Sequence, residues 1–132
     1  MSVSLKSVGA ITMFVEDSQR SKEFYARAFD LPAMWEDENS VVFKLDNTII
    51  NLLDRSEAHD LIAPAPVAAP SAGSSFQLTI WVDDADAASE ALATRGVTLL
   101  NGPLNRPWGV RTAAFTDPDG HVWEIAQQLG ES

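Results

Sequence analysis

The sequence of 132 residues predicts an α+β protein made of two similar modules, each with the element order β-α-β-β-β. Residues 9–17 and 76–84 are alike at a constant offset of 67, so that Thr12 matches Thr79 and Asp17 matches Asp84. Both segments are β-rich, and each is followed by a helical pattern and then by more β-rich sequence. Because strand, helix start and helix agree at one offset, the sequence predicts an internal duplication.

The helix of each module is predicted over residues 18–29 and 85–95. The first helix has an apolar stripe made of Phe24, Tyr25, Ala28 and Phe29. Asp17 and Asp84 stand just before the two helices, where a carboxylate accepts from the free N–H groups of the first turn. Gly96 follows the second helix at the position where a positive φ is preferred.

The remaining strands are predicted over residues 40–45 and 48–53 in the first module, and over 97–100, 110–116 and 121–126 in the second. Asp46-Asn47 and Asp119-Gly120 suit tight hairpin turns. Aligning the two hairpins pairs Asn51 with Glu124 at an offset of 73. The six additional residues of the second module are expected in a loop over residues 101–109.

The chain is predicted to be a single domain over residues 1–132, since its length suits one hydrophobic core. Module one covers about 6–55, a linker covers 56–73, and module two covers about 74–128. The linker contains three prolines and several alanines, which indicate a semi-rigid crossover rather than a packed element.

Composition excludes several classes of function. Nine Lys and Arg against 19 Asp and Glu give a net charge of −10, so we expect no nucleic acid and no membrane partner. The absence of cysteine excludes disulfides, thiolate catalysis, Cys-ligated zinc and iron–sulfur clusters. No signal peptide or membrane-length apolar run is visible, so a cytoplasmic location is expected.

Two segments near the end of the chain carry a resemblance to a known family. They read Pro-Trp-Gly-Val-Arg at residues 107–111 and Phe-Thr-Asp-Pro-Asp-Gly-His-Val-Trp-Glu at 115–124. Together with the Phe24-Tyr25 pair and the internal repeat, the chain resembles the vicinal oxygen chelate superfamily over roughly residues 6–128. This superfamily includes glyoxalase I, extradiol dioxygenases and bleomycin-resistance proteins. The resemblance implies a concave mixed-sheet cup, formed within one chain or across a dimer.

The resemblance also implies four positions for ligands of a divalent metal, which fall on Ala10, Asn51, Gln77 and Glu124. Ala10 cannot bind a metal, the two amides are weak donors, and Glu124 alone is a strong one. We therefore expect no metal cofactor; a divalent metal, if bound, would use Gln77 and Glu124. His59 of the linker is a candidate for a missing ligand, although a solvated position is favoured.

Strand alternation predicts which other side chains share the face of these four positions. The predicted ligand-binding residues of the strands are Thr12, Phe14, Asn51, Gln77, Thr79 and Trp81. Trp108 is added as a lid. Arg106 and Arg111 are both candidates to hold a ligand carboxylate, while a surface salt bridge is favoured for Arg106. Asn51 has a plain alternative as an amide bonded to a neighbouring strand or to its symmetry mate, and Gln77 as an amide at the edge of the core with its own partner. The alternative for Trp108 is a residue that packs its own loop. The mostly apolar face with few polar groups is typical of a small-molecule pocket.

Glu124 is the candidate catalytic residue. It lies between Trp123 and Ile125 in a strand that is predicted to be buried, where an unpaired charge is costly. It therefore needs a cation, a raised pKa or a partner such as Arg111. A desolvated carboxylate at this position would be a plausible general base.

Three functions follow from this sequence. The leading one is a glyoxalase/bleomycin-resistance-like protein that binds a small organic molecule, cationic or aromatic, without a catalytic metal and as a homodimer. The alternative is an enzyme: a metal-dependent lyase, isomerase or dioxygenase, or a metal-free enzyme with Glu124 as base. The third is a structural or regulatory dimer in which Asn51 and Glu124 pair across the interface.

Overall fold

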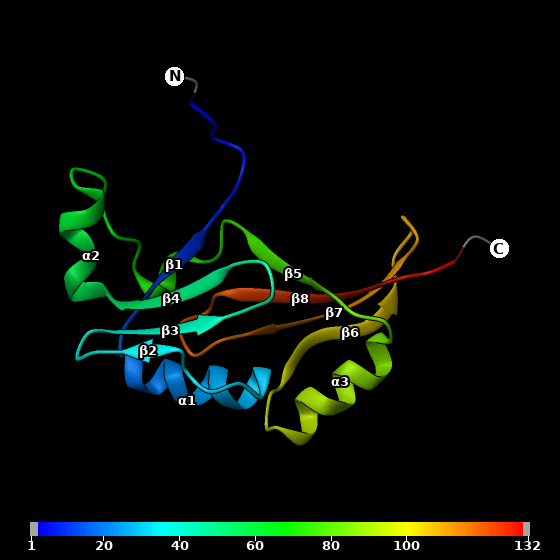
Figure 1. Ribbon diagram of the computed structural model, residues 1–132. Helices are drawn as coiled ribbons and strands as arrows, with labels where there is room; N and C mark the ends of the chain where they lie inside the picture. The colour runs from blue at the N-terminus through cyan, green and yellow to red at the C-terminus, as the bar shows by residue number, and fades with distance from the viewer. Residues whose placement is uncertain (1–2, 131–132) are drawn as a thin grey trace. The chain divides into compact units, whose positions relative to one another are not determined.

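The computed structural model describes residues 3–130 and contains two four-stranded mixed sheets with helices (Figure 1). The described chain divides into two compact units. Unit 1 holds the residues up to Ala26 together with Leu31–Val67, and unit 2 holds Arg27–Asp30 together with the chain from Ala68. The boundary falls inside the segment predicted as a linker; the single-domain organisation stays a prediction.

The first module has its strands in the order β1-β4-β3-β2, with β1 parallel to β4 and the other pairs antiparallel. Its elements are β1 (Ala10–Val15), α1 (Ser18–Phe29), β2 (Trp35–Glu36), β3 (Ser40–Lys44) and β4 (Ile49–Asp54). Helix α1 has the predicted limits. The two-residue strand β2 was not predicted, because a run so short carries no periodicity.

The second module repeats this order as β5-β8-β7-β6, with β5 parallel to β8. Its elements are β5 (Gln77–Trp81), α3 (Ala85–Thr94), β6 (Leu99–Asn105), β7 (Val110–Thr116) and β8 (Val122–Gln128). Thr12 pairs with Asn51 in the first sheet and Thr79 pairs with Glu124 in the second. The α+β class with two similar modules is therefore confirmed, and so are both offsets of the repeat.

The two main helices start in the same way in both modules. Asp54, the last residue of β4, accepts from the N–H of Ser18 at 2.8 Å, and Gln127 of β8 accepts from the N–H of Ala85 at 2.9 Å. Asp84 is the predicted cap of α3 and accepts from the N–H of Ala87 at 3.0 Å. Each helix is thus fixed to the strand beside which it starts, because its first free N–H groups are satisfied there.

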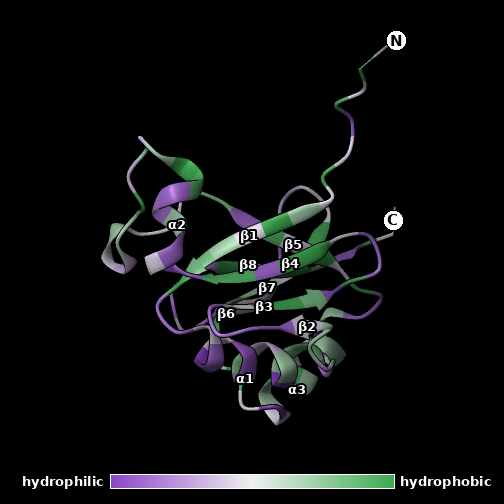
Figure 2. Ribbon diagram, turned by 60° about the vertical axis from the view of Figure 1, so that its left-hand side comes forward, coloured by the Kyte–Doolittle hydropathy of each residue, from purple (hydrophilic) through white to green (hydrophobic). Residues whose placement is uncertain are grey.

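Aromatic side chains form the core on the helix-covered face of each sheet. In unit 1, Tyr25 of α1 contacts Phe43 of β3. In unit 2, Phe29 packs edge-on against Trp123, which stacks on Phe115. Helices α1 and α3 carry both polar and apolar segments in Figure 2, as expected for helices with one buried face.

The predicted linker was wrong in part, because its first half is the helix α2 (Arg55–Ile62). Ala58 of this helix is fully buried, and α2 packs on β4 and β1 (Figure 1). The prolines indicated an extended crossover, because proline is unfavourable inside a helix. Pro64 lies after the end of α2, however, and does not prevent the preceding residues from forming a helix. A short 3₁₀ helix, η1, follows at Pro70–Ala72.

The predicted loop over residues 101–109 was also wrong in part, since strand β6 continues to Asn105 and the loop covers only residues 106–109. Irregular pairing with β7 between Leu99 and Leu104 accommodates Gly102 and Pro103. The six additional residues of the second module do lie in this region, but mostly in a longer strand. Among residues 3–130, no helix is long and apolar enough to span a membrane.

Candidate functional site

Each sheet has one face turned to its helix and one face that carries the candidate residues, which we call the open face. Along β1, Met13 and Val15 are buried, whereas Ala10 and Thr12 are exposed. Along β5 all three alternate residues of the open face are exposed: Gln77, Thr79 and Trp81. The alternation predicted from the sequence is therefore present, since successive strand side chains point to opposite faces.

The open face of the second module is organised around Glu124. This carboxylate is half-buried, and its Oε1 atom accepts a hydrogen bond of 2.9 Å from the hydroxyl of Thr79 on the adjacent strand. Its other oxygen makes no hydrogen bond among residues 3–130. One oxygen is thus fixed in place, while the second is available to a ligand.

The equivalent position of the first module is occupied by Asn51. Its Nδ2 group donates a long hydrogen bond of 3.5 Å to Thr12, and its Oδ1 atom is buried without a partner in the described chain. A buried amide oxygen without a partner costs about 1–3 kcal/mol, so this position favours an additional donor such as a water or a ligand.

These residues do not fit a catalytic transition metal. Ala10 has no donor atom, Asn51 and Gln77 have neutral amides, and Glu124 is the one carboxylate. Within residues 3–130 there is no group of three or more His, Cys, Asp or Glu side chains that could hold a metal ion. A catalytic zinc site needs about three good protein ligands.

Neither histidine completes such a group in the described chain. His59 is exposed on helix α2 rather than in an extended linker. His121 has its Nδ1 atom 2.7 Å from Oδ2 of Asp117, whose side chain is fully buried. Burial lowers the pKa of His121, but the hydrogen bond and charge of Asp117, with the charge of Asp119, raise it above its usual value of 6.5. This pair stabilises the turn between β7 and β8.

The two candidate arginines differ from their predictions. Arg111 lies on the helix-covered face, where it forms an ion pair of 3.0 Å with Asp86 of α3 and is not the partner of Glu124. Arg111 pairs with Gln127, three positions along β8 from Glu124, so its side chain points to the opposite face of the sheet from Glu124. Arg106 forms no surface salt bridge within residues 3–130; it donates instead to Thr112 at 2.9 Å and to Asn101 at 3.3 Å.

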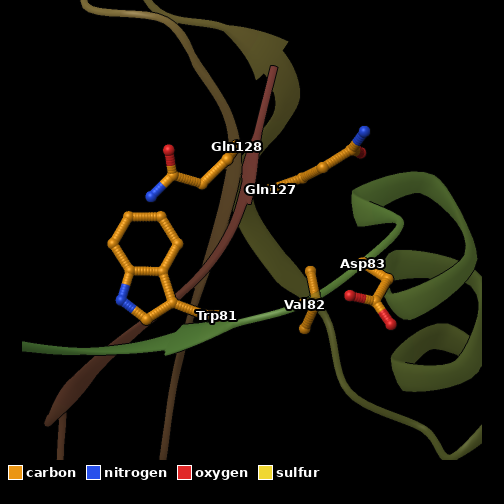
Figure 3. A pocket seen from close by; sticks show the side chains of 5 residues that line it. All are labelled: Trp81, Val82, Asp83, Gln127 and Gln128. Atoms are coloured by element: carbon orange, nitrogen blue, oxygen red, sulfur yellow. The ribbon is translucent and has the colours of Figure 1, made fainter. Parts of the chain in front are cut away.

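A pocket of about 320 Å³ lies at the end of β5 and β8 (Figure 3). It is lined by Trp81, Val82, Asp83, Gln127 and Gln128. The Trp81 ring and the Gln128 amide lie on one side of the strands, and Gln127 and Asp83 lie toward the helix. Trp81 is 60% exposed, an unusual position for so large an apolar ring.

Sequence reasoning found Trp81 but missed Asp83, Gln127 and Gln128. Gln128 continues the alternation from Glu124, so a longer predicted strand would have included it. Asp83 and Gln127 carried no comparable signal, because they lie beyond the strand end or on the other face. Trp108 is 70% exposed in the turn after β6.

The fold and its open faces define a known class of protein. A family model, described as "Glyoxalase/Bleomycin resistance protein/Dioxygenase superfamily", matches residues 7–125. This match covers most of the chain, so the protein belongs to that superfamily.

Individual relatives agree with this assignment. The chain is 32% identical over 123 residues to the "Uncharacterized protein YraH" of Bacillus subtilis (strain 168), covering 90% of this chain and 96% of that protein. A glyoxalase/bleomycin resistance protein/dioxygenase from Nocardioides has a similar fold, with a TM-score of 0.85 and 23% identity over 99% of this chain and 89% of that one. A lactoylglutathione lyase from Agrobacterium tumefaciens has a TM-score of 0.73 and 18% identity, covering 94% and 95% of the two chains. These two structures show the shared fold alone.

Proposed function

We propose that the open face of the second module binds a small organic molecule, aromatic and cationic, without a catalytic metal. The observation that carries this proposal is the Glu124 carboxylate, one oxygen of which is fixed by Thr79. The exposed Trp81 lies on the same strand as Thr79 and is a diagonal neighbour of Glu124. A half-buried carboxylate with one available oxygen is suited to an ammonium or amidinium group.

The surroundings of Glu124 favour a cation over an anion. An indole ring attracts cations through its face, and Trp81, a diagonal neighbour of Glu124 on the open face, is 60% exposed. The net charge of −10 adds a long-range attraction for positively charged molecules. An aromatic ring on the ligand would contact Trp81 while its cationic group reached Glu124.

Benzylamine is a suitable probe, because it combines an aromatic ring with one ammonium group. We expect saturable binding in an NMR titration of the protein, with backbone signals of β5 and β8 shifting, and weaker binding of neutral benzyl alcohol. Treatment with EDTA should leave the affinity unchanged, because no metal takes part. Glu124→Gln removes the charge and should weaken benzylamine binding at least about tenfold.

Glu90→Gln is the matched control, since Glu90 is exposed on α3 and the substitution changes net charge by the same amount. It should bind benzylamine as the unsubstituted protein does. Equal weakening by both substitutions would mean that only the overall charge matters. Equal affinity for benzylamine and benzyl alcohol would contradict a role for the carboxylate, and loss of binding in EDTA would contradict the metal-free site.

A metal-free enzyme with Glu124 as general base is the second candidate, supported by the same free carboxylate oxygen. It predicts that a bound molecule with an acidic C–H or O–H group is converted to product, as seen by NMR over time. Glu124→Gln would then stop turnover.

A further inference from the structure

Arg106 has an unusual set of partners for an arginine in so acidic a protein. Arg55, Arg95 and Arg111 each lie within 4.0 Å of a carboxylate oxygen. Arg106 donates only to neutral oxygens, from Nε to Thr112 and from Nη2 to Asn101, and within residues 3–130 it forms no ion pair. A guanidinium has five N–H donors, of which these two bonds use two.

The guanidinium lies on the same open face as Glu124. Thr112, which accepts from Arg106, pairs with Ala126 across β7 and β8, and Ala114 pairs with Glu124. Thr112 and Glu124 are therefore diagonal neighbours on one face, a relation that places such residues roughly 7–8 Å apart. Thr112 is buried, which fixes the position of the Nε contact.

The two opposite charges are held apart by neutral hydroxyl groups. Thr79 draws Glu124 toward β5, at one edge of the sheet, while Thr112 and Asn101 draw Arg106 toward β7 and β6, at the other. Both charged groups are half-buried and keep unused hydrogen-bonding atoms. Unused charges on one face that do not pair with each other are suited to a ligand with complementary charges at its two ends.

We propose that the open face of the second module recognises a zwitterionic ligand, with its ammonium group at Glu124 and a carboxylate or similar oxyanion at Arg106. This inference rests on the proposed binding function and adds the second charge of the ligand. The fork of the guanidinium matches the two oxygens of a carboxylate, so Arg106 acts as a specificity-determining residue. The net charge of −10 opposes the entry of simple anions, so the ammonium group is needed as well.

The test compares 4-(aminomethyl)benzoate with benzylamine, which lacks only the carboxylate. In the unsubstituted protein, NMR titration should give at least about tenfold tighter binding of 4-(aminomethyl)benzoate, the effect of a charge-assisted hydrogen bond. The Nε–H signal of Arg106 should shift with this probe and not with benzylamine. This comparison needs no substitution, so it stands even where a variant fails to fold.

Arg106→Gln tests whether the tighter binding of 4-(aminomethyl)benzoate depends on Arg106. It should abolish the preference, so that this variant binds 4-(aminomethyl)benzoate no more tightly than it binds benzylamine. Arg55→Gln is the matched control, because Arg55 lies in unit 1 and pairs with Glu16; it should keep the tenfold preference.

Equal binding of the two probes to the unsubstituted protein would overturn this inference and leave the proposed function intact. Failure of both probes to bind would overturn the proposed function itself. A preference that survives Arg106→Gln, or that is lost equally in Arg55→Gln, would show that Arg106 is not the carboxylate site.

Discussion

One position at which the two modules differ on the open face is Asn51 in the first module and Glu124 in the second. Thr12 and Asn51 occupy the positions that Thr79 and Glu124 occupy in the second sheet, with the same strand pairing. The hydroxyl of Thr79 donates to a carboxylate at 2.9 Å, whereas the contact of Thr12 with an amide is 3.5 Å long. A charged acceptor forms the shorter and stronger bond, so the second module has a charged group at the position where the first module has a neutral one.

His121 gives the stability of the protein a specific dependence on pH. Its pKa in the folded protein is raised above 6.5, because the effects of Asp117 and Asp119 outweigh that of burial. A raised folded-state pKa means that folding favours the protonated ring. The stabilisation is therefore complete below pH 6.5 and is lost as the pH rises through the folded-state pKa.

Urea unfolding at several pH values tests this prediction. The difference in the free energy of unfolding between the unsubstituted protein and His121→Gln should be largest near pH 5.5 and smaller near pH 8.5. His59→Gln serves as the control, since His59 is exposed on α2. A difference that is constant with pH would contradict the assigned role of the ion pair with Asp117.

At the scale of elements, the irregular pairing of β6 with β7 depends on Gly102. Gly102 has a φ of +84°, and a Cβ atom there would collide with the carbonyl oxygen of Thr112 and lie 2.7 Å from the Cα atom of Ala113. These neighbours are backbone atoms of a central strand and cannot move aside. Gly102→Ala should therefore lower the free energy of unfolding by roughly 2–4 kcal/mol, as measured in urea.

Gly73→Ala is the matched control for Gly102→Ala. Gly73 has nearly the same φ, +86°, but a Cβ atom added there would meet nothing within 4 Å, so only the backbone strain of about 1–2 kcal/mol applies. Equal decreases in the free energy of unfolding for both variants would mean that the close approach of β6 and β7 does not add to the cost of Gly102→Ala.

At the scale of the whole molecule, exposed sheet edges and aromatic side chains favour association. Strands β1 and β5 are edge strands of their own sheets, and Phe76, Trp81 and Trp108 are more than half exposed. Unpaired strand edges and exposed apolar side chains are typical of interaction surfaces. We therefore predict a homodimer.

Light scattering coupled to size-exclusion chromatography measures the mass directly. The expected value is twice the chain mass of 14.3 kDa, and it should persist on dilution to micromolar protein. A mass of one chain at all concentrations would contradict the dimer. Addition of 4-(aminomethyl)benzoate should leave the mass unchanged, because its proposed contacts lie within one module.

Much of the site could be predicted because strand alternation is a local property. The sequence placed Thr79, Trp81 and Glu124 on one face, and these residues do share the open face. The partners of charged side chains could not be predicted in this way. Arg111 and Arg106 are five residues apart, yet one pairs with Asp86 of a helix and the other with Thr112 of a strand.

The sequence by itself determined the repeat, the two main helices and the faces of the strands, because periodicity, capping residues and turns act over a few neighbouring residues. Only the tertiary structure decided that the linker begins as a helix, that β6 continues past Gly102, and that Arg106 has no acidic partner in the described chain. Each of these depends on which distant segment packs nearby: β4 and β1 against α2, and β7 against β6. Contacts between segments far apart in the chain are not encoded in local pattern, and they decide which charges remain available to a ligand.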